Sequence, residues 1–203
     1  EKIGAPKSPS GIARLGRDGL PSGELSAAAA AGVIGALLPE EAIVSDESIT
    51  AGIFLPAALG KAPPHDLLCN TGNAIGQGLP VASGAAVACP GRPVLALQAD
   101  GSAMYTIQAL WTQAREGLDV TTVLFDNGSY GILNIELDRL GLSSEVPLAR
   151  SMLAIDRPSI DFAALSKAMG VPASLALSAD DLVGQLGRAL SEEGPHLVHA
   201  MIT

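Results

Sequence analysis

Two short apolar runs that end in polar residues constrain the fold of this chain more than any other feature. The run at residues 94–98 leads to Asp100, and the run at residues 120–125 leads to Asn127. Short apolar runs bounded by glycine and polar residues are typical of strands that are buried on both faces of a parallel sheet. We therefore predict two buried strands, each followed by a side chain that carries an oxygen.

The segment between these two runs has the pattern of a helix. Apolar residues recur at helical spacing from Met104 to Ala114, among them Trp111, and Gly117 supplies a stop. A strand, a helix and a second strand form a right-handed crossover, which places the carboxyl ends of both strands side by side. A ligand of such a sheet is expected beyond those carboxyl ends.

Predicted strands alternate with helices along the rest of the chain. Helices are expected to start at a Ser22 cap, at an Asp161 cap and at residues 178–181. The alternation predicts an α/β fold, a doubly wound and mainly parallel six-stranded sheet with helices on both faces. The predicted strands are residues 42–44, 66–69, 94–98, 120–126, 171–177 and 196–202.

Composition sets the domain organisation and excludes some partners. Residues 23–203 are long enough for one globular domain, and the polar, Gly- and Pro-rich residues 1–22 read as a linker or as the tail of a preceding domain. A net charge of -9 argues against nucleic-acid and acidic-membrane partners. Only two cysteines occur, and neither a secretory signal nor a membrane span is visible, so we expect a cytoplasmic location.

Oxygen donors at the two strand ends point to a metal site. Mg²⁺ prefers hard oxygen ligands, with phosphate oxygens and water completing its shell. Asp100 would supply a carboxylate, Asn127 an amide oxygen and Ser129 a backbone or hydroxyl oxygen. Gly101 and Ser102 stand where the next helix begins, so their N–H groups can face a phosphate.

A glycine-rich loop at residues 70–80 is the second constellation, and segment 143–160 is the third. Three glycines, at 72, 76 and 78, indicate a close backbone approach, and Pro80 suits the first turn of a helix. Segment 143–160 has no clear period, because Pro147 and Pro158 interrupt a helix, and we expect a loop over the ligand there.

Each of these features also has an ordinary structural explanation. Asp-Gly-Ser after a strand can be a helix N-cap, Asn-Gly can be a turn, and the glycine-rich loop can be a tight corner. The sequence contains neither the Gly-x-Gly-x-x-Gly motif of a dinucleotide-binding fold nor the Gly-x-x-x-x-Gly-Lys motif of a phosphate-binding loop. His196 and His199 fall on opposite faces of a predicted strand, which argues against a shared metal.

Taken together, the motifs resemble a known family. Asp100-Gly101-Ser102 followed by Asp126-Asn127 is similar to the Gly-Asp-Gly to Asn-Asn signature of thiamine-diphosphate enzymes. From Glu24 to its end the chain resembles the carboxy-terminal cofactor-binding domain of the acetolactate synthase and benzoylformate decarboxylase family. Two positions depart from the signature, since Ala99 replaces its first Gly and Asp126 its first Asn.

The resemblance implies a cofactor and roles for several residues. Thiamine diphosphate and Mg²⁺ would be bound, with Asp100, Asn127 and Ser129 as the metal ligands. Ile75 matches the apolar wedge that bends the cofactor, and the Asn73 carbonyl would accept from its pyrimidine amino group. The full set of cofactor-binding residues implied in this way is Thr50, Asn73, Ile75, Gly101, Ser102, Tyr130 and Gly131.

The resemblance also implies a reaction class and a missing part. We expect an acetolactate-synthase-like enzyme that acts on 2-oxo acids, by decarboxylation with or without carboligation. A benzoylformate-type decarboxylase and a non-catalytic phosphate-binding remnant remain as alternatives. The family's activating Glu comes from another domain, of the same or a neighbouring subunit in a homodimer or homotetramer. Nothing in this chain matches it, and Glu47, Glu116 and Glu136 are assigned to loop or helix surface.

Overall fold

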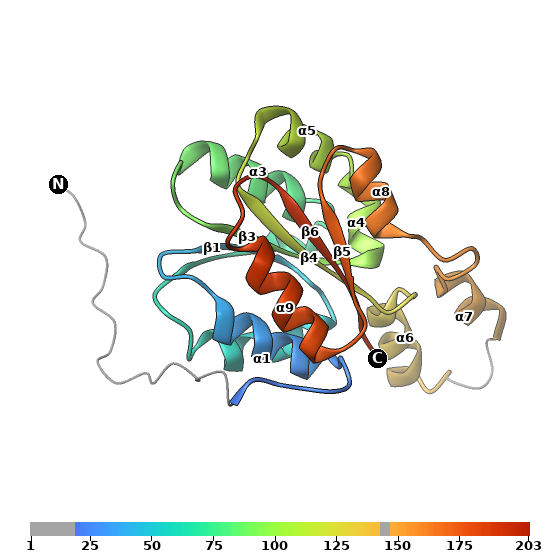
Figure 1. Ribbon diagram of the computed structural model, residues 1–203. Coiled ribbons are helices and arrows are strands. Elements are labelled where there is room, and N and C mark those ends of the chain that lie inside the picture. Colours follow the sequence, from blue (N-terminus) through green and yellow to red (C-terminus); the bar gives the residue numbers. More distant parts are fainter. Residues whose placement is uncertain (1–18, 143–146) are drawn as a thin grey trace.

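A computed structural model describes residues 19–142 and 147–203, which form a three-layer α/β fold (Figure 1). Its centre is a six-stranded sheet in the order β2-β1-β3-β4-β6-β5, and every neighbouring pair of strands is parallel. The predicted fold class and all six predicted strands are therefore confirmed. The strands are β1 Ile43–Glu47, β2 Asp66–Cys69, β3 Val94–Ala99, β4 Val120–Asp126, β5 Ala173–Ala176 and β6 His196–Met201.

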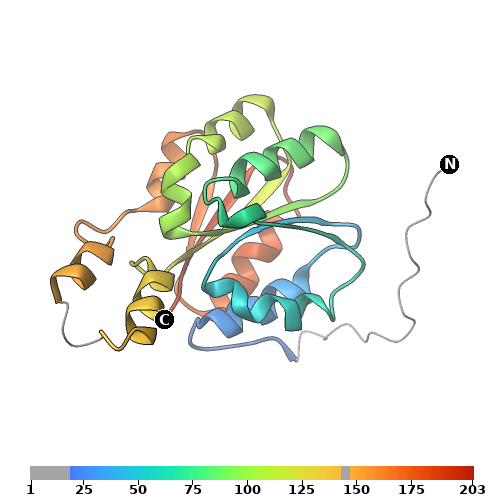
Figure 2. The ribbon, with the colours of Figure 1, turned by 180° about the vertical axis from the view of Figure 1, so that it is seen from behind.

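Helices cover both faces of this sheet (Figures 1 and 2). On one face α1, α2 and α9 pack over the sheet, and on the other face α3, α4, α5 and α8 do so. The described α-helices are α1 Ala27–Leu37, α2 Leu55–Leu59, α3 Gly78–Ala88, α4 Asp100–Thr106, α5 Ala109–Glu116, α6 Gly131–Arg139, α7 Pro147–Leu153, α8 Phe162–Ala168 and α9 Ala179–Ala189. Two short 3-10 helices, η2 Ala51–Phe54 and η3 Thr71–Asn73, complete the described elements.

Strand β3 shows why both faces need a helical cover. Leu95 and Leu97 belong to the core on the α1 and α9 side, whereas Val94 and Ala96 belong to the core on the α3 and α5 side. Side chains alternate between the faces of a strand, so an apolar run without polar interruption buries both faces. The uniform apolar run in the sequence thus fixes β3 in the middle of the sheet.

Two predicted helix positions are wrong in detail. Helix α1 is capped by Ser26, whose side chain accepts from the N–H of Ala29, and not by Ser22. The segment from Met104 onward forms two helices, α4 and α5, instead of one, because the chain leaves α4 after Thr106 and starts α5 after Gln108. Trp111 consequently lies at the surface, where Arg115 stacks over its ring at 4.9 Å.

Segment 143–160 is the larger correction. Residues 143–146 lie outside the described part of the chain, but α7 is a helix where a loop was predicted. Pro147 is the first residue of α7, a position where the missing N–H costs nothing, so it opens the helix instead of interrupting it. The residues after α7 reach the turn beyond β4, because Ile155 N–H donates to Gly128 O at 2.9 Å.

The predicted linker at residues 1–22 falls mostly outside the described residues, so this boundary stays a prediction. From Gly23 onward the chain is bonded to the domain. Gly23 N–H donates to Asp180 Oδ2 at 2.8 Å, and Glu24 forms an isolated antiparallel β-bridge with Ser178. No helix within residues 19–142 and 147–203 is long and apolar enough to cross a membrane.

Removal of the cap of α9 is expected to destabilise the domain. Ser178 Oγ accepts from Asp181 N–H at 3.0 Å, and Asp181 Oδ2 accepts from Ser178 N–H at 3.1 Å, which completes a capping box. The change Ser178→Ala should lower the free energy of unfolding by about 1 kcal/mol in urea denaturation. Ser191→Ala, which removes an exposed hydroxyl after the same helix, should change it by less than about 0.5 kcal/mol. Equal effects of the two changes would contradict the prediction.

Candidate functional site

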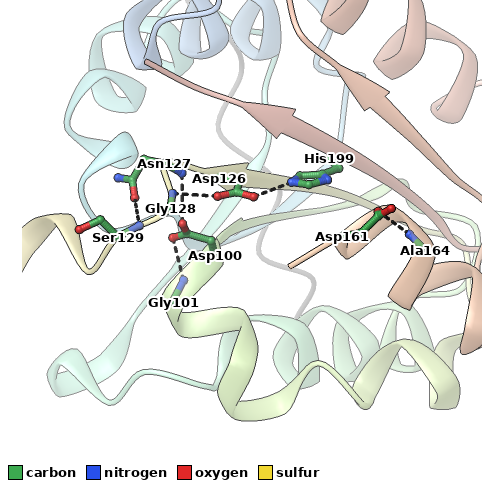
Figure 3. A network of polar contacts seen from close by, with 9 residues as sticks. All are labelled: Asp100, Gly101, Asp126, Asn127, Gly128, Ser129, Asp161, Ala164 and His199. Atoms are coloured by element: carbon green, nitrogen blue, oxygen red, sulfur yellow. Dashed lines mark hydrogen bonds and ion pairs between the residues drawn. The ribbon is translucent and has the colours of Figure 1, made fainter. Parts of the chain in front are cut away.

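The predicted metal ligands meet where β3 and β4 end. Asp100 is buried, with 3% of its surface exposed, and its Oδ2 accepts from the N–H of Asn127 at 3.1 Å (Figure 3). Its Oδ1 accepts from the N–H of Gly101 at 2.7 Å. The carboxylate is therefore held by backbone donors from both strand ends, which fixes its position at this edge of the sheet.

The turn after β4 is shaped by its own side chains. Asp126 Oδ1 accepts from Gly128 N–H at 2.8 Å, and Asn127 Oδ1 accepts from Ser129 N–H at 3.0 Å. Ser129 Oγ accepts from Asn134 Nδ2 at 2.7 Å, and the Ser129 carbonyl accepts from Gly131 N–H at 2.8 Å. Two of the three predicted ligands, Asn127 and Ser129, thus lie in one hydrogen-bonded turn, which Asp100 contacts through the N–H of Asn127. The Ser129 hydroxyl faces Asn134 of α6.

The carboxylates of Asp100 and Asp126 lie close together at this edge. Burial raises the pKa of the Asp100 carboxyl to about 6, and the hydrogen bond and charge of Asp126 act in the same direction. Burial alone would also raise the pKa of Asp126, but hydrogen bonds from His199 and from Gly128 N–H lower it below its usual value. A bound divalent cation would relieve this concentration of negative charge.

His199 is the partner of Asp126 that sequence reasoning missed. Its Nε2 lies 2.8 Å from Asp126 Oδ2, and its ring meets the edge of Phe162 with centroids 5.5 Å apart. Its Nδ1 is buried without a hydrogen-bond partner among the described residues. His196 instead lies with its Nε2 3.0 Å from Glu192 Oε2, so the two histidines have different partners.

Glycines let three more predicted residues approach the strand ends. A Cβ on Gly101 would lie 2.7 Å from the ring of Tyr130, so this ring rests directly on the start of α4. A Cβ on Gly131 would lie 3.0 Å from Asn127 Nδ2 and 3.2 Å from Thr50 Oγ1. Thr50, from the loop after β1, therefore reaches the same place as Asn127.

The glycine-rich loop after β2 presents its predicted residues at the surface. Asn73 and Ile75 are exposed, and Gly72, Asn73 and Gly76 have positive φ angles of 62°, 54° and 100°. Glycine and asparagine adopt positive φ more readily than other residues, so Gly72, Asn73 and Gly76 suit this tight loop. Strands β2 and β3 both run parallel to β1, which lies between them, so their carboxyl ends lie at the same edge of the sheet. The loop after β2 and Asp100 after β3 therefore lie at that edge.

Glu47 is the residue for which the surface assignment is wrong. It is the last residue of β1, with 1% of its surface exposed, and it accepts hydrogen bonds from the loop after β2. It was missed because the predicted strand stopped at residue 44, which left Glu47 in a loop. The sequence carries no clear signal for its burial, because Ser45 and Asp46 separate Glu47 from the apolar run at residues 42–44.

Ala99 occupies a backbone conformation that does not need glycine. Its φ of -83° and ψ of 151° are ordinary extended values, open to any residue. The Cβ of alanine therefore costs nothing at this first departure from the family signature.

The donors at this edge suit a hard cation that shares its shell with phosphate. Within the described residues, no cluster of three or more His, Cys, Asp or Glu side chains could hold a metal ion. The predicted set has one carboxylate, one amide oxygen and one backbone or hydroxyl oxygen, and Mg²⁺ commonly binds one or two carboxylates together with phosphates and water. The residues therefore fit a metal and a diphosphate. The fold and the site define a class of α/β domain whose polar groups gather where the parallel strands end.

Comparison with known proteins identifies the family. Residues 57–200 match the family described as thiamine pyrophosphate enzyme, C-terminal TPP binding domain, and the chain belongs to this family. It is 52% identical over 199 residues to IlvX of Mycobacterium tuberculosis, which is provisionally named as an acetolactate synthase large subunit. It is 34% identical over 166 residues to benzoylformate decarboxylase of Pseudomonas aeruginosa. These matches cover 98% and 82% of the chain but only 39% and 30% of the relatives.

Solved structures agree with the family. The thiamine diphosphate-dependent 4-hydroxybenzoylformate decarboxylase of Rhodococcus jostii RHA1 superposes with a TM-score of 0.77 at 29% identity, over 89% of this chain and 33% of that one. Benzoylformate decarboxylase of Polynucleobacter necessarius gives 0.73 at 27% identity, over 96% and 35%. The chain thus has the sequence and the fold of a C-terminal thiamine-pyrophosphate-binding domain, and it spans about a third of the length of the relatives that it matches.

A side chain at position 101 is expected to damage the site. In Gly101→Ala the new Cβ meets the Tyr130 ring at 2.7 Å, and the free energy of unfolding should fall by about 1–3 kcal/mol because the ring must move. Gly184→Ala is the matched control, since that helical glycine has no atom within 4 Å of its Cβ position, and it should gain about 0.5–1 kcal/mol. Urea denaturation measures both, and changes of the same sign would count against the packing described.

Proposed function

We propose that this domain binds thiamine diphosphate together with Mg²⁺ and serves as the cofactor half of an acetolactate-synthase-like enzyme that acts on 2-oxo acids. The main support is the position of Asp100 and Asn127, which adjoin at neighbouring strand ends in a family of thiamine-diphosphate-binding domains. The side chains of Thr50 and Tyr130 gather around the same point.

Each residue has a defined task in this proposal. Asp100, Asn127 Oδ1 and the carbonyl of Ser129 hold the metal, which neutralises the diphosphate. Backbone N–H groups of Gly101 and Ser102 face the phosphates, and Asn73 and Ile75 orient the ring. When bound, thiamine diphosphate supplies a carbon nucleophile that adds to the carbonyl of a 2-oxo acid. The residues of this chain that contact the cofactor in the proposal are Thr50, Asn73, Ile75, Gly101, Ser102, Tyr130 and Gly131.

The relatives support the class of substrate. Benzoylformate and 4-hydroxybenzoylformate are both 2-oxo acids, and they appear in the names of a relative and of a similar structure. The second candidate is therefore a benzoylformate-type decarboxylase. In such an enzyme the remainder of the substrate takes up a proton after the loss of carbon dioxide, instead of being joined to a second carbonyl compound. The run Ser129-Tyr130-Gly131 favours this alternative, because it resembles the Thr-Tyr-Gly of benzoylformate decarboxylase.

A further domain and a second subunit belong to the proposal. The chain spans 39% of IlvX, so the activating Glu is assigned to a pyrimidine-binding domain of the same or a neighbouring subunit, in a homodimer or homotetramer. We place the protein in the cytoplasm, a location with which its two free cysteines, Cys69 and Cys89, agree.

Binding of thiamine diphosphate should depend on Mg²⁺ and on Asp100. In titration calorimetry, Asp100→Ala should weaken Mg²⁺-dependent binding on the order of 100-fold, since even outer partners of metal ligands cost 10- to 100-fold. Asp119→Asn removes the same charge at the opposite end of β4, where Asp119 is exposed, and should leave binding unchanged. Unchanged binding in Asp100→Ala would favour the non-catalytic remnant.

The 203 residues alone should not turn over substrate. We expect weak binding of thiamine diphosphate and no release of carbon dioxide from pyruvate or benzoylformate, because the activating Glu of the family has no counterpart in this chain. A coupled assay for carbon dioxide with the purified chain checks this. Measurable decarboxylation would refute the assignment of that Glu to another domain.

A further inference from the structure

Glu47 joins three parts of the site through one buried carboxylate. Its Oε1 accepts from the N–H of Gly76 at 2.7 Å and of Gln77 at 3.2 Å. Its Oε2 accepts from the N–H of Gly78 at 3.0 Å and from Gln98 Nε2 at 2.8 Å. The end of β1 is thereby bonded to the loop after β2 and to the side chain of a residue in β3.

This carboxylate has no capacity left for a ligand. A carboxylate offers about four lone-pair positions, and four donors occupy them here. Since Glu47 is also buried, it is not placed to give a proton to a bound molecule or take one. Hydrogen bonds to a charged acceptor are among the stronger ones, so the four bonds act as a clamp on the backbone at Gly76 and Gly78.

The packing at Gly78 is a second, independent sign of this clamp. A Cβ at Gly78 would lie 2.5 Å from Gln98 Oε1, 2.7 Å from Glu47 Cβ and 2.9 Å from Glu47 Oε2. No side chain fits there, so the sequence needs glycine where the carboxylate approaches the backbone.

Two further bonds hold Gly76 and Gly78 through their carbonyl groups. Ser45 Oγ donates to Gly78 O at 2.9 Å, and Thr106 Oγ1 donates to Gly76 O at 2.8 Å. Residues 71–75, by contrast, are exposed. The fixed part of the loop therefore begins one residue after Ile75.

Gln98 extends the clamp toward the metal end of the site. Its Nε2 also donates to Ser102 Oγ at 2.7 Å, in the first turn of α4. Ser102 Oγ in turn lies 3.3 Å from the carbonyl of Glu47. One buried network thus connects the glycine-rich loop with the helix that starts at Asp100.

We propose that Glu47 is the positioning residue of the ring-contacting loop: its carboxylate fixes Gly76, Gln77 and Gly78 and thereby sets where Asn73 and Ile75 stand relative to Asp100. This role rests on the proposed binding of thiamine diphosphate. A pre-shaped loop binds more tightly because less freedom is lost on binding. Three of the four donors to Glu47 are backbone groups of the glycine-rich loop, so the clamp contributes to recognition of the ring more than of the diphosphate.

A comparison of thiamine diphosphate with inorganic diphosphate distinguishes this positioning role from a general structural role of Glu47. In calorimetry with Mg²⁺, Glu47→Gln should bind thiamine diphosphate about tenfold more weakly. The same variant should bind inorganic diphosphate, which lacks the ring, within about twofold of the wild type. Glu40→Gln, an exposed change of the same kind just before β1, is the control and should alter neither affinity. An equal loss for both ligands, or no loss for either, would overturn the proposal.

Amide hydrogen exchange tests the clamp without any ligand. In the wild-type chain the amides of Gly76 and Gly78 should exchange about 10- to 100-fold more slowly than those of Gly72 and Asn73, the factor that a charge-assisted hydrogen bond represents. Equal rates would refute the clamp even if Glu47→Gln failed to fold. If the wild type bound neither ligand, the proposed function would fail, whereas this measurement would still decide whether Glu47 fixes the loop.

Discussion

The parallel pairing of β3 with β4 is the constraint on which the rest of the site depends. In this register Ala99 faces Phe125 across the ladder, so the next residues, Asp100 and Asp126, are neighbours where the two strands end. A shift by one residue would turn every side chain of β4 to the other face of the sheet. The two cores resist such a shift, because it would move Val123 and Phe125 out of the core that they fill and into the other one. The apolar cores thus set where the polar residues at the strand ends lie.

The two carboxylates buried at the strand ends are bonded to the backbone of neighbouring loops. Asp100 and Glu47 each accept from backbone N–H groups of a neighbouring loop, so each carboxylate shapes a second segment of chain. Backbone donors cannot move away as side chains can, and a buried acceptor without a partner would cost about 1–3 kcal/mol. The edge of the sheet is therefore shaped in advance for a ligand, with the stronger constraints on the backbone of the binding loops.

Sequence patterns predicted the strands and the adjacency of their ends, which depend on the periodicity of apolar residues. They did not predict features that tertiary contacts determine. The six strands and the adjacency of Asp100 and Asn127 follow from apolar runs and parallel connections. The burial of Glu47 could not be read from the sequence, because it requires the loop at residues 76–78 to fold back over β1. The break between α4 and α5 and the helix that Pro147 opens also went unpredicted, since in both cases local propensity allowed more than one outcome.

The two departures from the family signature have separate physical solutions, and this bears on whether the domain kept its site. Ala99 is accommodated because the backbone there is extended, so the signature glycine is not required for the conformation. Asp126 adds a carboxylate beside Asp100, and a second acid so close would oppose the charge on the first. His199 offsets this, since its Nε2 lies 2.8 Å from Asp126 Oδ2 and pairs with that carboxylate. His199 is buried in β6, and a carboxylate buried beside another acid is stable only with such a partner. The first departure from the signature is therefore accommodated by backbone conformation, and the second by the pairing of Asp126 with His199.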